Sequence, residues 1–172
     1  SAFYFLDGWA ERIELLLASN EIEEAEILLQ HAKERLAEAT VMEAEGQTEY
    51  VESTILEYAE KVNEASEKIA EMNILETEES NEQLESLEDE LDVVLEESDE
   101  IEEKLSDEIK EEIKEVKNES YIKATVVKDI DKTTVENLKE EYELGLGEIA
   151  KLYVLSTKTE VPIEELIVKY RE

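Results

Sequence analysis

Twelve residues of this sequence, DIDKTTVENLKE from Asp129 to Glu140, carry oxygen atoms at the spacing of a calcium-binding loop. Loops of the EF-hand type take their side-chain ligands from the first, third, fifth, ninth and twelfth positions. The sixth position of such a loop is a glycine that allows a sharp turn, but Thr134 occupies it here. A helix start capped by Asp131 or Thr133 is the alternative interpretation. The residues that would bind calcium are Asp129, Asp131, Thr133, Asn137 and Glu140.

Catalytic motifs are missing from the sequence. His31 is the single histidine, which excludes a zinc site built from several histidines. Leu28 precedes it by three residues, so the Glu-x-x-His motif of di-iron bundles is absent, and there is no Gly-x-Ser-x-Gly elbow. Glycosidase-type catalysis needs two carboxyl groups on opposite sides of a cleft. Amphipathic helices with acids on their outer faces do not predict such a cleft. We therefore expect no enzymatic activity, and we interpret His31 as an ordinary residue at the edge of an apolar helix face.

The charge of the chain restricts its partners. Fifty acidic residues against 17 basic ones give a net charge of −33, which repels nucleic acid and anionic membranes. Residues 76–103 contain many acids and no base, so they form either a solvated helix face or a diffuse binding surface for Ca²⁺ or Mg²⁺. No apolar run approaches the roughly 20 residues that span a bilayer, so we expect no membrane insertion. A protein partner, or association of the chain with itself, remains open.

Apolar residues recur at helical spacing along most of the chain. The composition is rich in Glu, Leu, Ala and Lys, with one Pro and four Gly, which favours long helices. In the second long helix the apolar stripe alternates steps of four and three residues without a fault, which is typical of a coiled-coil seam. We predict an all-α fold: an elongated antiparallel bundle of three long helices, Glu21–Glu45, Thr48–Leu75 and Asn81–Glu103.

The remainder of the chain is less regular in sequence. Around Ser106 the apolar spacing changes, which indicates either a stutter in one helix or the start of a new one. Residues 118–132 have no clear period and could form a short strand, a loop or a helix end; we predict irregular structure there. Helical patterns return from Thr133, and Pro162 suits the first turn of a last helix. We therefore divide the chain into an acidic helical bundle, 1–120, and a small helical C-terminal extension, 121–172.

The chain opens with FYFLDGWAERIELLLASN, which contains both phenylalanines and the single tryptophan. Leu6, Trp9, Ile13 and Leu17 are spaced as one face of a helix, so we predict that this face, with Phe5, packs into the bundle core. A membrane-surface anchor is disfavoured because the polar face of the segment is acidic. A binding patch would instead leave Phe3, Phe5 and Trp9 exposed.

The first two thirds of the chain resemble an uncharacterised domain family. The resemblance rests on FYFLDGWAERIELLL, on EEAEILLQHAKERLAEA after it, and on YVESTILEYAEKVNEA after Gly46, and it covers about residues 3–118. Such domains occur in bacterial and archaeal proteins, often behind a signal peptide. This chain departs from them at Asp7, where a basic residue is usual, and near Ser106, where a proline is usual. The resemblance implies an extracytoplasmic or secreted helical domain, and it assigns no catalytic residue.

Two functions from different classes follow from these observations. The leading one is a non-catalytic interaction or structural module of the cell envelope, because no convergent polar cluster stands apart from the acidic surface. The alternative is a cation-responsive binding protein that uses Ca²⁺ at residues 129–140 or on the acidic face of 76–103. A cytoplasmic location stays open for either function.

Overall fold

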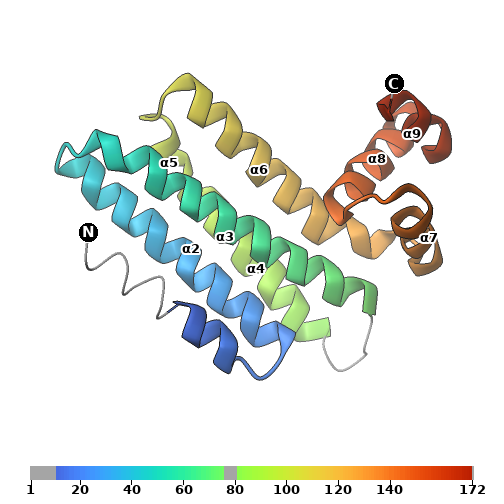
Figure 1. The fold of residues 1–172 in the computed structure, drawn as a ribbon, viewed down its shortest axis with the longest axis horizontal. Helices are drawn as coiled ribbons and strands as arrows, with labels where there is room; N and C mark the ends of the chain where they lie inside the picture. Colours follow the sequence, from blue (N-terminus) through green and yellow to red (C-terminus); the bar gives the residue numbers. More distant parts are fainter. Residues whose placement is uncertain (1–10, 76–80, 172) are drawn as a thin grey trace.

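The computed structural model describes residues 11–75 and 81–171, and within those ranges it contains helices and no strands, as the predicted all-α class requires (Figure 1). Residues 11–17 are helical. None of the described helices has both the length and the apolar composition to cross a membrane. The remaining elements are α2 (Glu21–Ala44), α3 (Thr48–Leu75), α4 (Asn81–Glu97), α5 (Asp99–Glu102), α6 (Asp107–Val126), the 3₁₀ turn η1 (Val127–Asp129), α7 (Lys132–Tyr142), α8 (Leu146–Thr159) and α9 (Ile163–Arg171).

Helices α2 and α3 form an antiparallel hairpin along the length of the molecule (Figure 1). Asn20 caps the N-terminus of α2, because its side-chain oxygen accepts a 2.9 Å hydrogen bond from the backbone N–H of Glu23. Gly46 turns the chain after α2 with φ of 75°, a left-handed conformation that glycine adopts at little cost. These two local features fix where the hairpin begins and where it reverses.

The interface of the hairpin is the seam that the sequence predicts. Ala25, Ala32 and Ala39 of α2 are fully buried, and their small side chains let the two helix axes approach closely. The apolar stripe of α3 is buried along its whole length and comprises Val51, Ile55, Tyr58, Val62, Ala65, Ile69 and Met72.

Helix α4 is shorter than predicted, because it ends at Glu97 and does not continue to Glu103. Ser98 is fully buried at the break, and its hydroxyl lies 2.9 Å from the carbonyl oxygen of Leu95 and 2.5 Å from a carboxylate oxygen of Glu102. A serine hydroxyl that hydrogen-bonds a backbone carbonyl of the preceding turn competes with regular helical hydrogen bonding. Ser98, the polar residue that interrupts the apolar stripe, therefore marks the end of α4. The short helix α5 follows.

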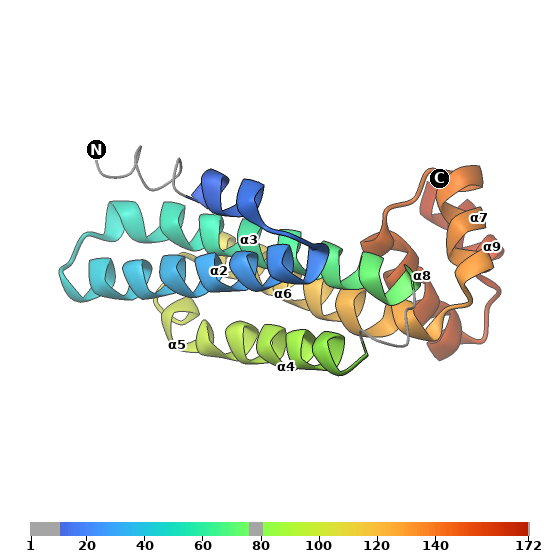
Figure 2. The ribbon, with the colours of Figure 1, turned by 90° about the horizontal axis from the view of Figure 1, so that it is seen from below.

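Helix α6 completes a bundle with α2, α3 and α4 (Figures 1 and 2). At one end, the backbone N–H of Ser106 donates to Glu52 of α3 at 3.1 Å. Near the other end, the ammonium of Lys123 donates to Asn63 of α3 at 2.7 Å. The residue numbers increase in the same direction along both helices, so α6 runs parallel to α3. Helices α4 and α5 connect the end of α3 to the start of α6.

The prediction of irregular structure was wrong for most of residues 118–132 and is confirmed only for Ile130 and Asp131. Residues 118–126 continue α6, and a 3₁₀ turn follows directly. The stretch is rich in β-branched residues, but tertiary contacts override that weak preference. Ser120 and Ala124 are fully buried, and Lys123 is buried with them. These residues are three or four positions apart, so they form one helix face that packs on the bundle.

The C-terminal helices α7, α8 and α9 gather at one end of the bundle (Figure 2). Their buried side chains form a second cluster, which includes Val135, Ile149 and Ile167 and also Ala70 near the end of α3. The predicted division at residue 120 falls inside α6. The division into a bundle and a C-terminal extension stays a prediction.

Candidate functional site

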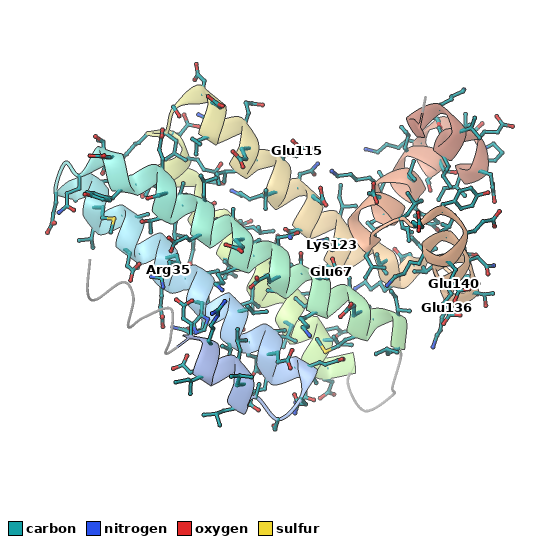
Figure 3. The ribbon with its side chains drawn as sticks, viewed as in Figure 1. Arg35, Glu67, Glu115, Lys123, Glu136 and Glu140 are labelled. Carbon is teal, nitrogen blue, oxygen red and sulfur yellow. The ribbon has the colours of Figure 1, made fainter. Side chains whose placement is uncertain are left out.

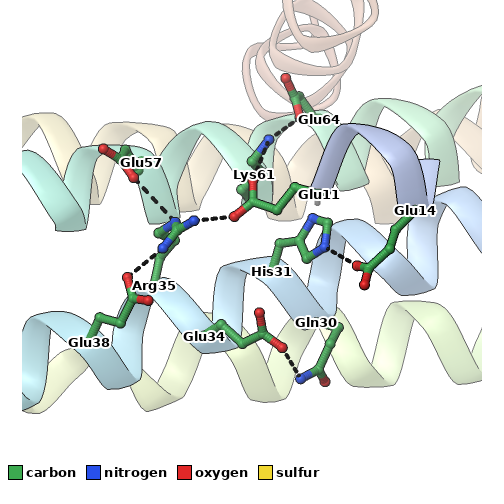
Figure 4. Close-up of polar contacts among 10 residues, drawn as sticks. All are labelled: Glu11, Glu14, Gln30, His31, Glu34, Arg35, Glu38, Glu57, Lys61 and Glu64. Carbon is green, nitrogen blue, oxygen red and sulfur yellow. Dashed lines mark hydrogen bonds and ion pairs between the residues drawn. The ribbon is translucent and has the colours of Figure 1, made fainter. Parts of the chain in front are cut away.

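The helical segment 11–17 lies against α2 and α3, with its charged face turned toward them (Figure 4). Leu15 packs against the core. Ile13 and Leu17, predicted to lie in the core, have 45% and 76% of their surface exposed, so that part of the prediction was wrong. The other members of that predicted core face, Phe5, Leu6 and Trp9, lie outside the described residues, as does Phe3.

Arg35 is the centre of a buried charge layer beneath this segment. Its side chain is only 6% exposed, although it sits on a helix of a strongly charged protein. The guanidinium pairs with Glu11 of the N-terminal segment, with Glu38 one turn further along α2, and with Glu57 of α3 at 3.2 Å. One side chain of α2 therefore ties the N-terminal segment and α3 together (Figure 4).

Arg35 is surrounded by more carboxylates than its single charge can neutralise. Burial lowers the pKa of Arg35, but its hydrogen bond to Glu38 and the neighbouring negative charges outweigh burial and raise this pKa above its ordinary value. Burial also raises the pKa of the Glu57 carboxyl; Arg35 opposes this rise, whereas Glu11 and the other nearby acids add to it. The ionised form of Glu57 is thus disfavoured in the folded protein, and Arg35 stays charged.

Glu11 also contacts a second cation, Lys61 of α3, at 3.8 Å. Lys61 in turn lies 3.5 Å from Glu64 on the next turn of α3. Only 14% of the Glu11 side chain is exposed, so this carboxylate is placed between two positive charges away from bulk water. Burial of a charge is tolerated when it is paired in this way, and the pairing fixes the rotation of the segment 11–17.

His31 lies one helical turn before Arg35 and is 2% exposed. Its Nε2 atom is 2.9 Å from a carboxylate oxygen of Glu14, whereas its Nδ1 atom is buried without a hydrogen-bond partner. The Glu14 side chain itself is 61% exposed. A histidine–carboxylate pair can serve as a general base, but the chain has no cysteine, and within residues 11–75 and 81–171 no serine or threonine hydroxyl is hydrogen-bonded to His31.

Two other buried polar side chains, Lys123 and Glu102, also form ion pairs or hydrogen bonds between helices. Lys123 of α6, 3% exposed, contacts Asn63 at 2.7 Å and Glu67 at 3.0 Å on α3. Glu102 contacts Lys117 at 2.5 Å, which ties α5 to α6. These pairs join helices that are distant in sequence, and their geometry is that of packing contacts.

The five residues of the predicted calcium loop lie at a helix start. Asp131 caps α7, and its carboxylate accepts a 3.1 Å hydrogen bond from the backbone N–H of Thr134. Thr133, Asn137 and Glu140 follow on successive turns of the helix, and Asp129 precedes it in the 3₁₀ turn. Over residues 11–75 and 81–171, no group of three or more His, Asp or Glu side chains is arranged to hold a metal ion. Calcium binding by this segment stays a prediction.

Sequence reasoning missed Arg35, the best-buried cation of the layer. A usable indication was present, because Arg35 follows Ala32 by three residues and Leu28 by seven, which places it on the apolar face of α2. A basic residue at a core position requires a carboxylate partner from another element. The identity of that partner, Glu11, depends on how the N-terminal segment docks and cannot be read from spacing within α2.

These features define an all-α bundle domain whose N-terminal segment is fixed by buried ion pairs. The chain matches the family described as Domain of unknown function (DUF5667) over residues 1–143. Since the match covers most of the chain, the protein belongs to this family, which confirms the expected membership of an uncharacterised domain family. The matched region extends beyond residue 118, where the resemblance was expected to end, and includes α7. No match was found among curated proteins or among solved structures.

Proposed function

We propose that this domain is a non-catalytic helical interaction module that acts outside the cytoplasm, as part of the cell envelope. The observation that carries the proposal is an aliphatic stripe on the segment 11–17. Leu16 and Leu17 are 83% and 76% exposed, and Ile13 lies one turn before them at 45%. Spacings of three and four residues put these side chains on one helix face, and a contiguous exposed apolar surface on a soluble domain typically contacts a partner.

The ion pairs beneath the stripe support this interpretation. An exposed apolar helix face would ordinarily rotate inward to bury its surface. Here, inward rotation would remove Glu11, the most buried carboxylate partner of Arg35 and Lys61, and leave these cations with partners that are 38% to 46% exposed. Breaking a buried ion pair costs at most about 3–5 kcal/mol here, since Arg35 keeps Glu38 and Glu57 and Lys61 keeps Glu64, and burying one or two leucines gains a comparable amount. The segment is therefore held with its aliphatic face outward.

The non-catalytic part of the proposal is supported by the use to which the buried titratable groups are put. His31, Arg35 and Lys123 are each paired with carboxylates or amides from other helices, as described above.

The extracytoplasmic part of the proposal is supported by the resemblance of the sequence to domains that often follow a signal peptide. Its test is protease treatment of intact cells that make the full-length protein: digestion of this domain is expected, and complete protection would contradict the location.

Site-specific crosslinking tests the interaction itself. A photoreactive phenylalanine analogue replaces Leu16 in one protein and Lys132, an exposed residue of α7, in a matched control. Both proteins are irradiated in the cells that produce them. We expect a discrete adduct of constant size from position 16 and none from position 132. Equal adducts from both positions, or none from position 16, would contradict a partner at the stripe.

A further inference from the structure

A groove of about 900 Å³ opens beside the aliphatic stripe, between the segment 11–17, α2 and α3. Its apolar lining comes from Leu15 and Leu16 of the segment and from Leu28 of α2. This volume lies at the upper end of the range in which proteins bind ligands. The walls are helices, and a helix laid between two others is a recurrent mode of peptide recognition.

The wall formed by α3 is acidic. Glu64, Glu67 and Glu71 all line the groove, and their spacing of three and four residues places them in one row along the helix. The side chains of Glu64 and Glu67 are 42% and 41% exposed, and they lie 3.5 Å from Lys61 and 3.0 Å from Lys123, respectively. Two cations, Arg12 and Lys68, also line the groove, and Lys68 pairs with Glu24 at 2.7 Å; against them stand four lining glutamates, so the lining is negative on balance.

We infer that the groove binds a cationic amphipathic helix, with aliphatic side chains against Leu15, Leu16 and Leu28 and with Lys or Arg residues along the Glu64–Glu71 row. This inference rests on the proposed interaction function and adds the chemistry of the partner. A partner helix with basic residues three or four apart would match the row of glutamates. Its apolar face would cover leucine surface that is otherwise in contact with water.

Charge decides against the other occupants. A second copy of this chain also carries a net charge of −33, so two copies meeting at an acidic groove would repel each other. The same charge repels anionic lipid surfaces and nucleic acid. A basic partner is attracted over a longer distance and associates faster at low ionic strength. The acidic row and the overall charge thus favour the same class of partner.

The probes for the test are three synthetic peptides of about 18 residues, long enough to form several helical turns. One is an amphipathic Leu/Lys helix, the second has the same composition in a permuted, non-amphipathic order, and the third is an amphipathic Leu/Glu helix. Binding to the whole protein is measured by isothermal titration calorimetry at physiological ionic strength. We expect one-to-one binding of the Leu/Lys helix that is at least about tenfold tighter than binding of either control peptide.

Two sets of variants locate the binding. Leu16→Gln alters a side chain that is 83% exposed, and a Glu64→Lys and Glu71→Lys double variant reverses the charge of the row. The matched control is Glu136→Lys with Glu140→Lys, which reverses two exposed charges on α7, at the other end of the molecule (Figure 3). Each groove variant should weaken binding of the Leu/Lys helix by at least about fivefold, as changes at interface contacts do, whereas the control should change it less than twofold. Circular dichroism confirms that each variant is folded.

Each remaining outcome overturns the inference in an identifiable way. Equal binding of the permuted peptide, or binding unaffected by Leu16→Gln, would indicate diffuse charge attraction. Leu16-dependent binding of the Leu/Glu helix would overturn the cationic partner but leave the interaction function standing. A Leu16-dependent dimer in light scattering would identify a second copy as the occupant. If no peptide binds, the inference fails, and an adduct from position 16 in cells then decides separately whether the interaction function survives.

Discussion

Glu11 of the N-terminal segment and Arg35 of α2 form an ion pair from which solvent is largely excluded, with 14% and 6% of the two side chains exposed. This contact decides which face of the segment 11–17 meets the bundle. An apolar stripe alone would turn Ile13 and Leu17 inward, but pairing of the buried guanidinium turns Glu11 inward in their place. The exposed stripe, and with it the proposed function, follows from this one relationship.

Arg35→Leu should destabilise the protein strongly, by about 3 kcal/mol or more, because it leaves the carboxylates of Glu11, Glu38 and Glu57 close together without their shared cation. Urea unfolding followed by circular dichroism measures the change. The matched control is Arg12→Leu, an exposed arginine on the same segment, whose removal should change stability by no more than about 0.5 kcal/mol. Similar values for the two variants would contradict a buried charge layer.

The long helices could be predicted from sequence because their periodicity reports directly on burial. The α3 stripe from Val51 to Met72 is buried throughout, as its spacing requires. The interruption at Ser98 was visible in the sequence, but whether a buried serine bends, breaks or merely weakens a helix depends on its neighbours, here Glu102. The end of α6 was missed because the β-branched residues around Val126 carry a strand-like preference that packing against α3 overcomes.

The candidate site was less accessible to sequence reasoning than the fold. His31 and Arg35 lie on α2, but their partners lie on the N-terminal segment and on α3. Spacing within one helix gives the face on which a residue lies and not the element that covers that face. The calcium-loop pattern illustrates the converse case, because oxygen spacing alone does not distinguish a loop from a helix capped by Asp131.

Glu57→Gln should leave the protein equally or more stable at pH 7. The pKa of Glu57 is raised in the folded state, so near its ordinary value of 4.5 the native protein holds more protons at this site than the unfolded chain does. The contribution of Glu57 to stability therefore falls as the pH rises through that region, and its ionisation is unfavourable at pH 7. Glutamine cannot ionise. The gain should stay below about 1 kcal/mol, because 46% of the side chain is exposed and solvent screens its charge.

The pH dependence of this variant is the decisive measurement. Unfolding is followed in urea at pH 7 and at about pH 3.5, where the carboxyl is protonated in both states and the gain should disappear. Glu60→Gln, at an exposed position of the same helix, controls for the loss of one negative charge from a protein of net charge −33. A clear loss of stability at pH 7 in Glu57→Gln alone would show that the ion pair with Arg35 outweighs burial.

Gly147 of α8 lies against the side chain of Glu119 of α6. A Cβ atom at this position would meet the Glu119 side chain, 3.1 Å from its Cδ and 3.2 Å from its Cγ atom. Gly147→Ala must therefore displace Glu119, whose carboxylate pairs with Lys151 at 2.6 Å, and we expect a loss of about 1 kcal/mol. In a Glu119→Ala background the same change should cost nothing, because the obstructing atoms are gone. Equal costs in both backgrounds would exclude this clash as the cause.

Calcium should produce no stoichiometric binding in calorimetry, because the Asp131 carboxylate already caps α7 through its contact with Thr134. Asp131→Ala should instead cost about 1 kcal/mol of stability, in the presence and in the absence of Ca²⁺, as loss of a helix cap does. A one-to-one site of micromolar affinity that disappears in Asp131→Ala would contradict this expectation and establish the cation-responsive alternative.

The central claim is that Leu16 and Leu17 form an interaction surface and are not part of the core. The most direct test is the free energy of unfolding of a Leu16→Gln and Leu17→Gln double variant, since glutamine and leucine have similar helix propensities. Exposures of 83% and 76% predict a change within about 0.5 kcal/mol, accompanied by loss of Leu/Lys helix binding. Leu15→Gln, which alters the leucine that packs on the core, should cost clearly more. A loss of about 3 kcal/mol or more in the double variant would place both leucines in the core and contradict the account.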